Sequence, residues 1–212
     1  MRVSIVDYGM GNLHSVAKAI EHVAPEVKLS VTSDASAIHN ADKVVFPGQG
    51  AMPDCMRELE QKGLRQAIIE AAKEKPFLGL CIGLQMLFAS SEEGDVPGLD
   101  VLPGRVVRFR SPLYDSRAQK LKIPHMGWNG VAQTRPHPLW KNIASDTRFY
   151  FVHSYYVDTP EIGIIAGTTE YPLRFTSACT RDNIFAVQFH PEKSQMAGLT
   201  LLRNFIDWDG AS

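Results

Sequence analysis

Apolar positions in the first half of the chain follow two patterns, one typical of strands and one typical of helices, and segments of the two kinds alternate along the chain. Short apolar runs typical of strands occur at residues 3–6, 27–31, 43–46 and 77–80. Between the strands, Leu13–Val23 has apolar residues at helical spacing, with Asn12 as an N-cap. Residues 54–75 also indicate helix, with a break at Gly63. Strands that alternate with helices in this way predict a parallel sheet, with the functional site at the carboxyl ends of its strands.

The pattern changes after residue 99. Shorter strands separated by turn residues are predicted at 101–109, 131–133, 149–157 and 162–168. They indicate an antiparallel layer, and residues 195–208 predict a final helix with one apolar face. No repeat or linker divides the chain, so we expect a single α/β domain over residues 1–212. It would have a mostly parallel central sheet flanked by helices and a smaller antiparallel β layer.

Composition narrows the class of protein. Of the 212 residues, 44% are hydrophobic and 21% are charged, which is ordinary for a globular domain. The formal net charge of -1 gives no electrostatic reason to expect nucleic acid or an anionic membrane as partner. No apolar run approaches the ~20 residues of a membrane span, and the first residues form a strand pattern rather than a signal peptide. The three cysteines Cys55, Cys81 and Cys179 lack metal-ligand spacing, and their odd number fits a reducing cytoplasm.

The strand at 77–80 leads into a motif that contains a candidate nucleophile. It enters Gly79-Leu80-Cys81-Ile82-Gly83, which a helix-like run at 84–88 follows. This is the thiol form of the nucleophile elbow, a sharp strand-to-helix turn whose glycines leave room for a strained nucleophile. A free cysteine is more commonly a small buried core residue, so the elbow alone leaves both interpretations open.

A base candidate follows another buried strand, at residues 184–189. There His190-Pro191-Glu192 places a carboxylate two residues beyond an imidazole, an arrangement that can orient a general base for a thiol. His190 alone could be an ordinary surface histidine, but together with the elbow it favours nucleophilic catalysis. The strand at 43–46 runs into Pro47-Gly48-Gln49-Gly50, whose backbone N–H groups could hold an oxyanion, although Pro-Gly also marks common turns.

Together these three motifs resemble the signatures of class I, triad-type glutamine amidotransferases. Segments 7–12, 125–129 and 149–155 are also similar to one subfamily, the glutaminase subunits of imidazole glycerol phosphate synthase in histidine biosynthesis. The resemblance extends from residue 3 to about residue 207. Glutaminases that serve pyridoxal phosphate, anthranilate or guanylate synthesis remain the main alternative. A cysteine peptidase, a γ-glutamyl hydrolase or a binding module would be more distant ones.

The resemblance implies a mechanism and a set of site residues. Cys81 would attack the carboxamide carbon of L-glutamine, with His190 as base and Glu192 as the residue that orients it. Backbone N–H groups of Ile82 and of the Gly48–Gln49 segment would hold the oxyanion; Gln49 stands where relatives commonly have a small or β-branched residue. The residues that match glutamine-binding positions are Gly50, Gln85, His153, Ser154 and Tyr155.

The same resemblance implies a protein partner and no cofactor. Ammonia would pass to a separate (β/α)8-barrel cyclase subunit, which forms a heterodimer with this chain. Seven residues match positions near the subunit contact: Gly9, Met10, Gly11, Asn12, Trp128, Asn129 and Tyr150. From the residues alone, Trp128 and Tyr150 could equally be core aromatics.

Overall fold

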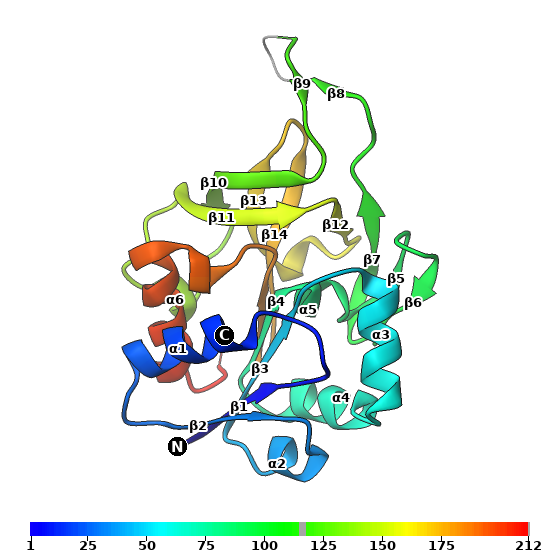
Figure 1. Cartoon of the computed structure of the whole chain (residues 1–212). Helices are drawn as coiled ribbons and strands as arrows, with labels where there is room; N and C mark the ends of the chain where they lie inside the picture. Colours follow the sequence, from blue (N-terminus) through cyan, green and yellow to red (C-terminus); the bar gives the residue numbers. More distant parts are fainter. Residues whose placement is uncertain (115–117, 212) are drawn as a thin grey trace.

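A mixed β-sheet forms the centre of the protein in the computed structural model, which describes residues 1–114 and 118–211 (Figure 1). Five neighbouring strands are parallel. In spatial order they are β2 (Lys28–Thr32), β1 (Arg2–Val6), β3 (Lys43–Gly48), β4 (Phe77–Cys81) and β15 (Ile184–Val187). Their carboxyl ends therefore meet at one edge, as the alternation of strands and helices predicted.

Helices cover both faces of the parallel strands. The helices α1 (Leu13–Val23) and α6 (Gln195–Asp207) pack with one set of strand residues, including Val45 and Leu78. The opposite face, which includes Phe46, packs against α2 (Ala35–His39), α3 (Met52–Gln61) and α4 (Arg65–Glu74). Adjacent strand residues point to opposite faces, so a continuous apolar run such as that of β3 is required by burial on both sides. Among the described residues, no helix is both long and apolar enough to cross a membrane.

Antiparallel strands continue the sheet beyond β15. Strand β14 (Arg174–Arg181) pairs antiparallel with β15 and so connects the two parts. On one side of β14 lie β12 (Tyr155–Asp158), β7 (Leu102–Arg108), β5 (Phe88–Ser91) and β6 (Val96–Pro97). On the other lie β13 (Ile165–Glu170), β10 (His125–Gln133) and β11 (Thr147–His153). A small hairpin, β8 (Leu113–Tyr114) with β9 (Lys120–Leu121), extends beyond them (Figure 1).

The predicted fold class is confirmed, as are the Asn12 cap, whose Oδ1 accepts from the backbone N–H of Ser15, and the break between α3 and α4 near Gly63. The helix predicted at 84–88 is confirmed only for residues 84 and 85. The single-turn helix α5 (Ile82–Gln85) ends early because Phe88 begins β5 and pairs with β7.

Two strand predictions in the antiparallel part also need correction. The strand predicted at 149–157 is two strands separated at Ser154, because β11 pairs with β10 whereas β12 pairs with β7. Residues 162–164 form the 3-10 turn η2 (Ile162–Ile164) before β13, while η1 (Pro138–Trp140) and η3 (Pro191–Lys193) are further short turns. Strand β14 was not predicted.

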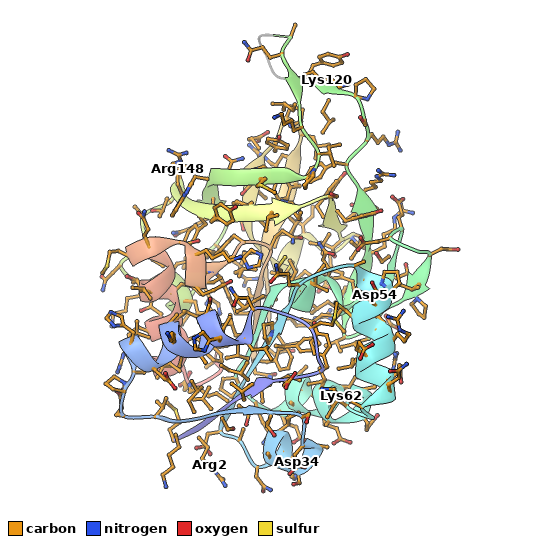
Figure 2. The ribbon with its side chains drawn as sticks, viewed as in Figure 1. Arg2, Asp34, Asp54, Lys62, Lys120 and Arg148 are labelled. Atoms are coloured by element: carbon orange, nitrogen blue, oxygen red, sulfur yellow. The ribbon has the colours of Figure 1, made fainter. Side chains whose placement is uncertain are left out.

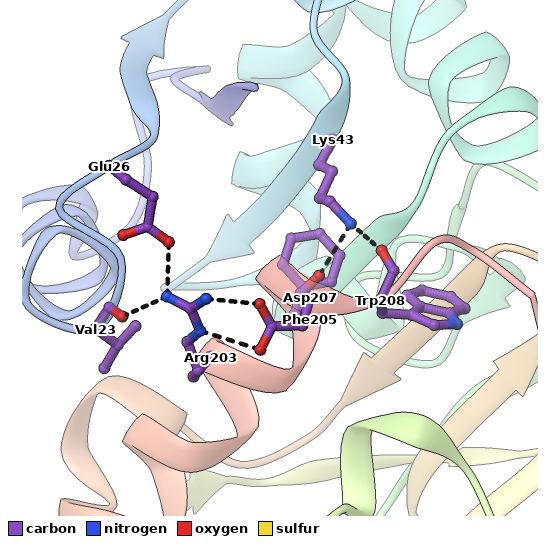
Figure 3. Close-up of polar contacts among 7 residues, drawn as sticks. All are labelled: Val23, Glu26, Lys43, Arg203, Phe205, Asp207 and Trp208. Carbon is purple, nitrogen blue, oxygen red and sulfur yellow. Dashed lines mark hydrogen bonds and ion pairs between the residues drawn. The ribbon is translucent and has the colours of Figure 1, made fainter.

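A buried lysine joins the start of β3 to the end of α6. Lys43 is only 6% exposed, and its Nζ donates to the backbone carbonyls of Phe205, at 3.3 Å, and of Trp208 (Figure 3). Burial lowers the pKa of Lys43. Nearby, the Arg203 guanidinium on α6 binds Asp207 through two nitrogens and reaches Glu26 beyond α1. These contacts hold the final helix against the amino-terminal half of the sheet.

Candidate active site

Cys81 lies at the end of β4, where the chain turns sharply into α5. Its backbone has φ of 54° and ψ of -107°, a conformation that costs a non-glycine residue about 1–3 kcal/mol. Gly83 makes this turn possible, because a Cβ there would lie 1.8 Å from the Phe46 carbonyl oxygen. The Cys81 residue is 3% exposed. The elbow expected from the sequence therefore places a strained thiol at the carboxyl edge of the sheet.

His190 and Glu192 lie at the same edge, after β15. The Nδ1 atom of His190 is 2.8 Å from Oε1 of Glu192, and their side chains are 5% and 2% exposed. A carboxylate accepts, so Nδ1 carries a proton. Burial by itself lowers the pKa of His190, but the negative charge of a Cys81 thiolate, together with that of Glu192, outweighs it and raises the pKa. Nε2 of His190 has no hydrogen-bond partner among the described residues, which leaves it available to the thiol.

Backbone contacts from β11 fix the His190 loop. The His190 N–H donates to the Tyr150 carbonyl at 2.9 Å, and the Tyr150 N–H donates to Ser194 Oγ at 3.0 Å. Ser194 Oγ in turn donates to the His190 carbonyl at 2.6 Å. Tyr150 and the base candidate are thus joined by one direct hydrogen bond and by two more through Ser194.

The Gly48–Gln49 segment also borders the thiol. Gly48 is the register partner of Cys81 between β3 and β4, and a Cβ on Gly48 would lie 2.7 Å from that of Ile82. The Gln49 side chain is exposed, while its carbonyl accepts from the buried Cys55 thiol at 3.7 Å. The larger side chain at position 49 is thus accommodated on the outside of the loop.

A cavity of about 300 Å³ opens above Cys81. Its lining includes all five residues predicted to bind glutamine: Gly50, Gln85, His153, Ser154 and Tyr155. It also includes Gln49, Ile82 and His190. Gln85 has a buried Oε1 atom without a hydrogen-bond partner among the described residues, and this atom can accept a hydrogen bond from a ligand.

One lining residue was missed from the sequence. Glu93, in the turn after β5, faces the cavity and accepts a hydrogen bond from the Met52 N–H at 2.8 Å. This contact lies at the start of α3, where the helix dipole favours a carboxylate. The sequence around Glu93 carries no motif, so only the fold shows that it belongs to the site.

The predicted ligand residue His153 is held as a neutral ring. The Tyr155 carbonyl can only accept, so His153 Nδ1 donates to it at 2.8 Å and His153 Nε2 accepts from His125 Nδ1 at 2.9 Å. Burial lowers the pKa of His153 to about 3 and that of His125 to about 4. His153 therefore shapes the cavity without acting as a base at neutral pH.

The predicted contact residues on β10 and β11 lie at the surface. Trp128 pairs with Tyr150 across the two strands, their rings lie 6.2 Å apart in an edge-on arrangement, and Trp128 is 37% exposed. The alternative that both are core aromatics is therefore wrong for Trp128. Asn129 donates to the Glu170 carbonyl at 2.9 Å. Arg148 donates to the Trp128 carbonyl at 3.2 Å and points outward from this strand pair (Figure 2).

The other predicted contact segment, residues 9–12, packs beside the Gly48–Gly50 loop. A Cβ on Gly11 would lie 3.8 Å from Cα of Gly48, and one on Gly50 would lie 2.8 Å from the methyl group of Met10. Gly9 and Gly11 are exposed, and Met10 and Asn12 are half-buried. A molecule that binds this segment would therefore press directly on the loop beside Cys81.

Comparison with known proteins identifies the class. Residues 4–208 match the model of the glutamine amidotransferase class-I family, and the chain belongs to this family. Similar folds occur in a "Crystal structure of glutamine amidotransferase" (TM-score 0.72, 13% identity, 97% of each chain) and in a glutamine amidotransferase from Thermotoga maritima (TM-score 0.65, 17% identity, 98% of this chain and 96% of that chain).

Closer sequence relatives define the subfamily. Both are named "Imidazole glycerol phosphate synthase subunit HisH". The protein from Nitrosospira multiformis is 64% identical over 97% of each chain, and that from Nitrosomonas europaea is 61% identical over 97% of this chain and 98% of its own. The family and subfamily expected from the sequence are thereby confirmed.

Proposed function

We propose that this chain is the glutaminase subunit of an imidazole glycerol phosphate synthase, and that its reaction takes place at Cys81. One observation carries the proposal: a strained Cys81 shares a cavity with His190, which is hydrogen-bonded to a buried Glu192. Membership of the amidotransferase family, and relatives that are 64% and 61% identical, support the substrate and the pathway. Such identity over nearly the whole chain disfavours the glutaminases of other synthases.

The reaction splits amide hydrolysis into two steps. The Cys81 thiolate attacks the side-chain carboxamide carbon of L-glutamine, and His190, which has taken the thiol proton, gives it to the departing ammonia. Water then attacks the γ-glutamyl thioester, His190 accepts its proton, and glutamate leaves as the thiol re-forms. Glu192 keeps a proton on Nδ1 of His190 and stabilises the imidazolium, so that Nε2 carries out both transfers.

The cavity supplies groups for each part of the substrate. The backbone N–H groups of Ile82 and Gln49 would hold the oxyanion, since both residues line the cavity next to Cys81. Glu93 offers a carboxylate to the α-ammonium group of glutamine, and Gln85 Oε1 offers a buried acceptor. Gly50 and the 153–155 segment form the remaining wall.

The ammonia would be delivered to a (β/α)8-barrel cyclase in a heterodimer, to give imidazole glycerol phosphate and aminoimidazole carboxamide ribonucleotide. The exposed Trp128 and its neighbours Asn129 and Tyr150 suit a docking surface, because aromatic residues are favoured at interface centres. Segment 9–12 adds a contact that reaches the Gly48–Gly50 loop. The three free cysteines agree with a cytoplasmic setting.

Glutamate release from L-glutamine tests this function. We expect slow release by the chain alone and a large increase when the barrel cyclase is added together with its nucleotide ligand. A complex that forms without any increase would contradict the proposed coupling. Failure of the two proteins to bind would contradict the assignment to imidazole glycerol phosphate synthase, and no hydrolysis under any condition would contradict glutaminase activity.

A further inference from the structure

A second polar side chain approaches the Cys81 sulfur. Gln188 follows β15, two residues before His190, and it is 0% exposed. Its Nε2 lies 3.7 Å from Cys81 Sγ, within hydrogen-bond distance for sulfur. Its backbone N–H donates to the Ser177 carbonyl at 2.9 Å, which anchors the residue to β14. The sequence places Gln188 in a run of buried strand residues, where a carboxamide needs partners.

The direction of this hydrogen bond follows from its neighbours. The Tyr155 carbonyl can only accept, and it lies 3.1 Å from Nε2 of Gln85, which must therefore be the donor end of the Gln85 amide. The same Nε2 donates to Oε1 of Gln188 at 2.9 Å. Oε1 of Gln188 is thus the acceptor, and its NH₂ group is the end that faces the sulfur. The Tyr155 carbonyl therefore fixes the orientation of the Gln85 amide, and the Gln85 amide fixes that of the Gln188 amide.

We propose that Gln188 is a further catalytic residue, whose carboxamide N–H donates a hydrogen bond to the Cys81 thiolate. This inference rests on the proposed role of Cys81 as nucleophile. A neutral donor stabilises the thiolate without adding a second positive charge beside His190, so it does not oppose protonation of the imidazole. The same hydrogen bond fixes the position of the sulfur in the cavity that Cys81 and His190 both line.

The role predicts an effect on protonation rather than on substrate affinity. A hydrogen-bond donor that favours the charged form lowers the pKa of an acid, and removing it raises that pKa. Loss of the Gln188 donor should therefore reduce the fraction of reactive thiolate at neutral pH. Raising the pH should restore that fraction, whereas a purely structural defect would persist at every pH.

The test is the pH dependence of Cys81 alkylation by iodoacetamide in the full chain, with the modified peptide quantified by mass spectrometry. We expect Gln188→Met, which keeps the volume but lacks the donor, to move the midpoint upward by about 1 pH unit. In the complex with the cyclase, kcat/KM for glutamine should fall about tenfold at neutral pH with little change in KM. An unchanged midpoint in a folded Gln188→Met protein would overturn the inference.

Two further variants make the test specific. Gln188→Glu keeps the size and the acceptor for Gln85 but brings a carboxylate to the sulfur, so its midpoint should rise beyond that of Gln188→Met; an unchanged midpoint here also overturns the inference. Ser177→Ala is the matched control, because Ser177 is fully buried next to Gln188 and its hydroxyl accepts from Thr169 Oγ1 rather than contacting the thiol. Its midpoint should equal that of the unmodified chain. Alkylation requires no glutamine, so a failure of the proposed glutaminase function would appear separately.

Discussion

The two ends of strand β3 have different surroundings: residues at one end stabilise the fold, and residues at the other lie beside the candidate nucleophile. At its start, the buried Lys43 ammonium donates to two carbonyls at the end of α6. At its other end, Gly48 lies beside Cys81, where several buried polar atoms have no partner among the described residues. These atoms are Tyr8 Oη, Gln85 Oε1, His190 Nε2 and Glu192 Oε2. Among the described residues, one other buried side-chain polar atom has no hydrogen-bond partner. It is His137 Nε2, whose ring packs against Phe185 and Trp208.

The difference has a simple physical meaning. A buried polar atom without a partner costs about 1–3 kcal/mol, so its retention suggests that a ligand or a reacting group satisfies it. The Lys43 ammonium already has its partners, so this contact stabilises the fold. Substitutions at the two ends should therefore alter different measured quantities.

The largest effect is expected at the end that carries the candidate nucleophile Cys81. Cys81→Ala removes one sulfur atom and should lower glutamine hydrolysis by at least about 1,000-fold, because the members of the proposed catalytic triad would act as a unit. The free energy of unfolding should change little, since the strained backbone remains and only one atom is lost. Steady-state glutamate release and urea denaturation measure the two quantities. Residual activity within about tenfold of the unmodified protein would show that Cys81 is not the nucleophile.

Acid should lower the free energy of unfolding, because the protein buries neutral histidines. Burial lowers the pKa of His125 and His137 to about 4 and that of His153 to about 3, below the ordinary value of about 6.5. Unfolding lets these rings bind protons, so stability is present above pH 6.5 and is lost as the pH falls toward 4. A pKa lowered by about 2.5 units corresponds to about 3 kcal/mol for each ring, so the combined loss should be several kcal/mol, which urea denaturation at a series of pH values would measure.

A matched variant sharpens the acid prediction. His137→Gln changes only the histidine that packs near Trp208, so it should remove about a third of the pH dependence and leave glutaminase activity intact. A free energy of unfolding that stays constant between pH 7 and pH 4.5 would contradict the assignment of these rings as neutral and buried.

At the Lys43 end we expect a moderate loss of stability alone. Lys43→Met preserves much of the side-chain volume but leaves the carbonyls of Phe205 and Trp208 without their donor. The free energy of unfolding should fall by about 2 kcal/mol, the range for a hydrogen bond to a charged group. Kinetics measured well below the melting temperature should be unchanged. A drop in kcat without any loss of stability would show that the two ends are coupled.

The smallest effect is expected at the surface beside Lys43. Arg203 binds Asp207 and Glu26 with distances of 2.7–3.0 Å (Figure 3). All three side chains are nevertheless partly exposed. Arg203→Ala should therefore lower the free energy of unfolding by only about 0.5–1 kcal/mol, and high salt should reduce the difference. A loss above about 2 kcal/mol would mean that this exposed network stabilises the junction as strongly as the buried Lys43.

The local sequence predicted the structure best where the backbone conformation allows few residue types. The elbow at Cys81 requires small residues, so its glycine spacing was visible without any structure, and the helix at 13–23 was predicted with the bounds that the structure shows. Periodicity failed where pairing partners decide the outcome. The apolar residues after Gln85 suit either a helix or a strand, and only the contact between Phe88 and β7 selects the strand.

The candidate site could be predicted only in part, because some of its residues lie in local motifs and others do not. Cys81 and His190 follow strands with recognisable motifs, whereas Glu93 and Gln188 have no local signal. A carboxylate in a turn and a glutamine in a buried run look ordinary in sequence. Their relation to the sulfur arises from long-range pairing of β4 with β15 and from packing of the turn after β5 against α3.

The exposure of Trp128 also gives the protein a built-in optical probe. The three tryptophans of the chain differ in environment: Trp140 and Trp208 are 5% and 3% exposed, while Trp128 is 37% exposed. Emission from an indole shifts to shorter wavelength when water is removed from its surroundings. A molecule that covers the Trp128 and Tyr150 face would thus shift the emission of one indole against a constant background from the other two. Association could then be followed by intrinsic fluorescence, without any label attached to the protein.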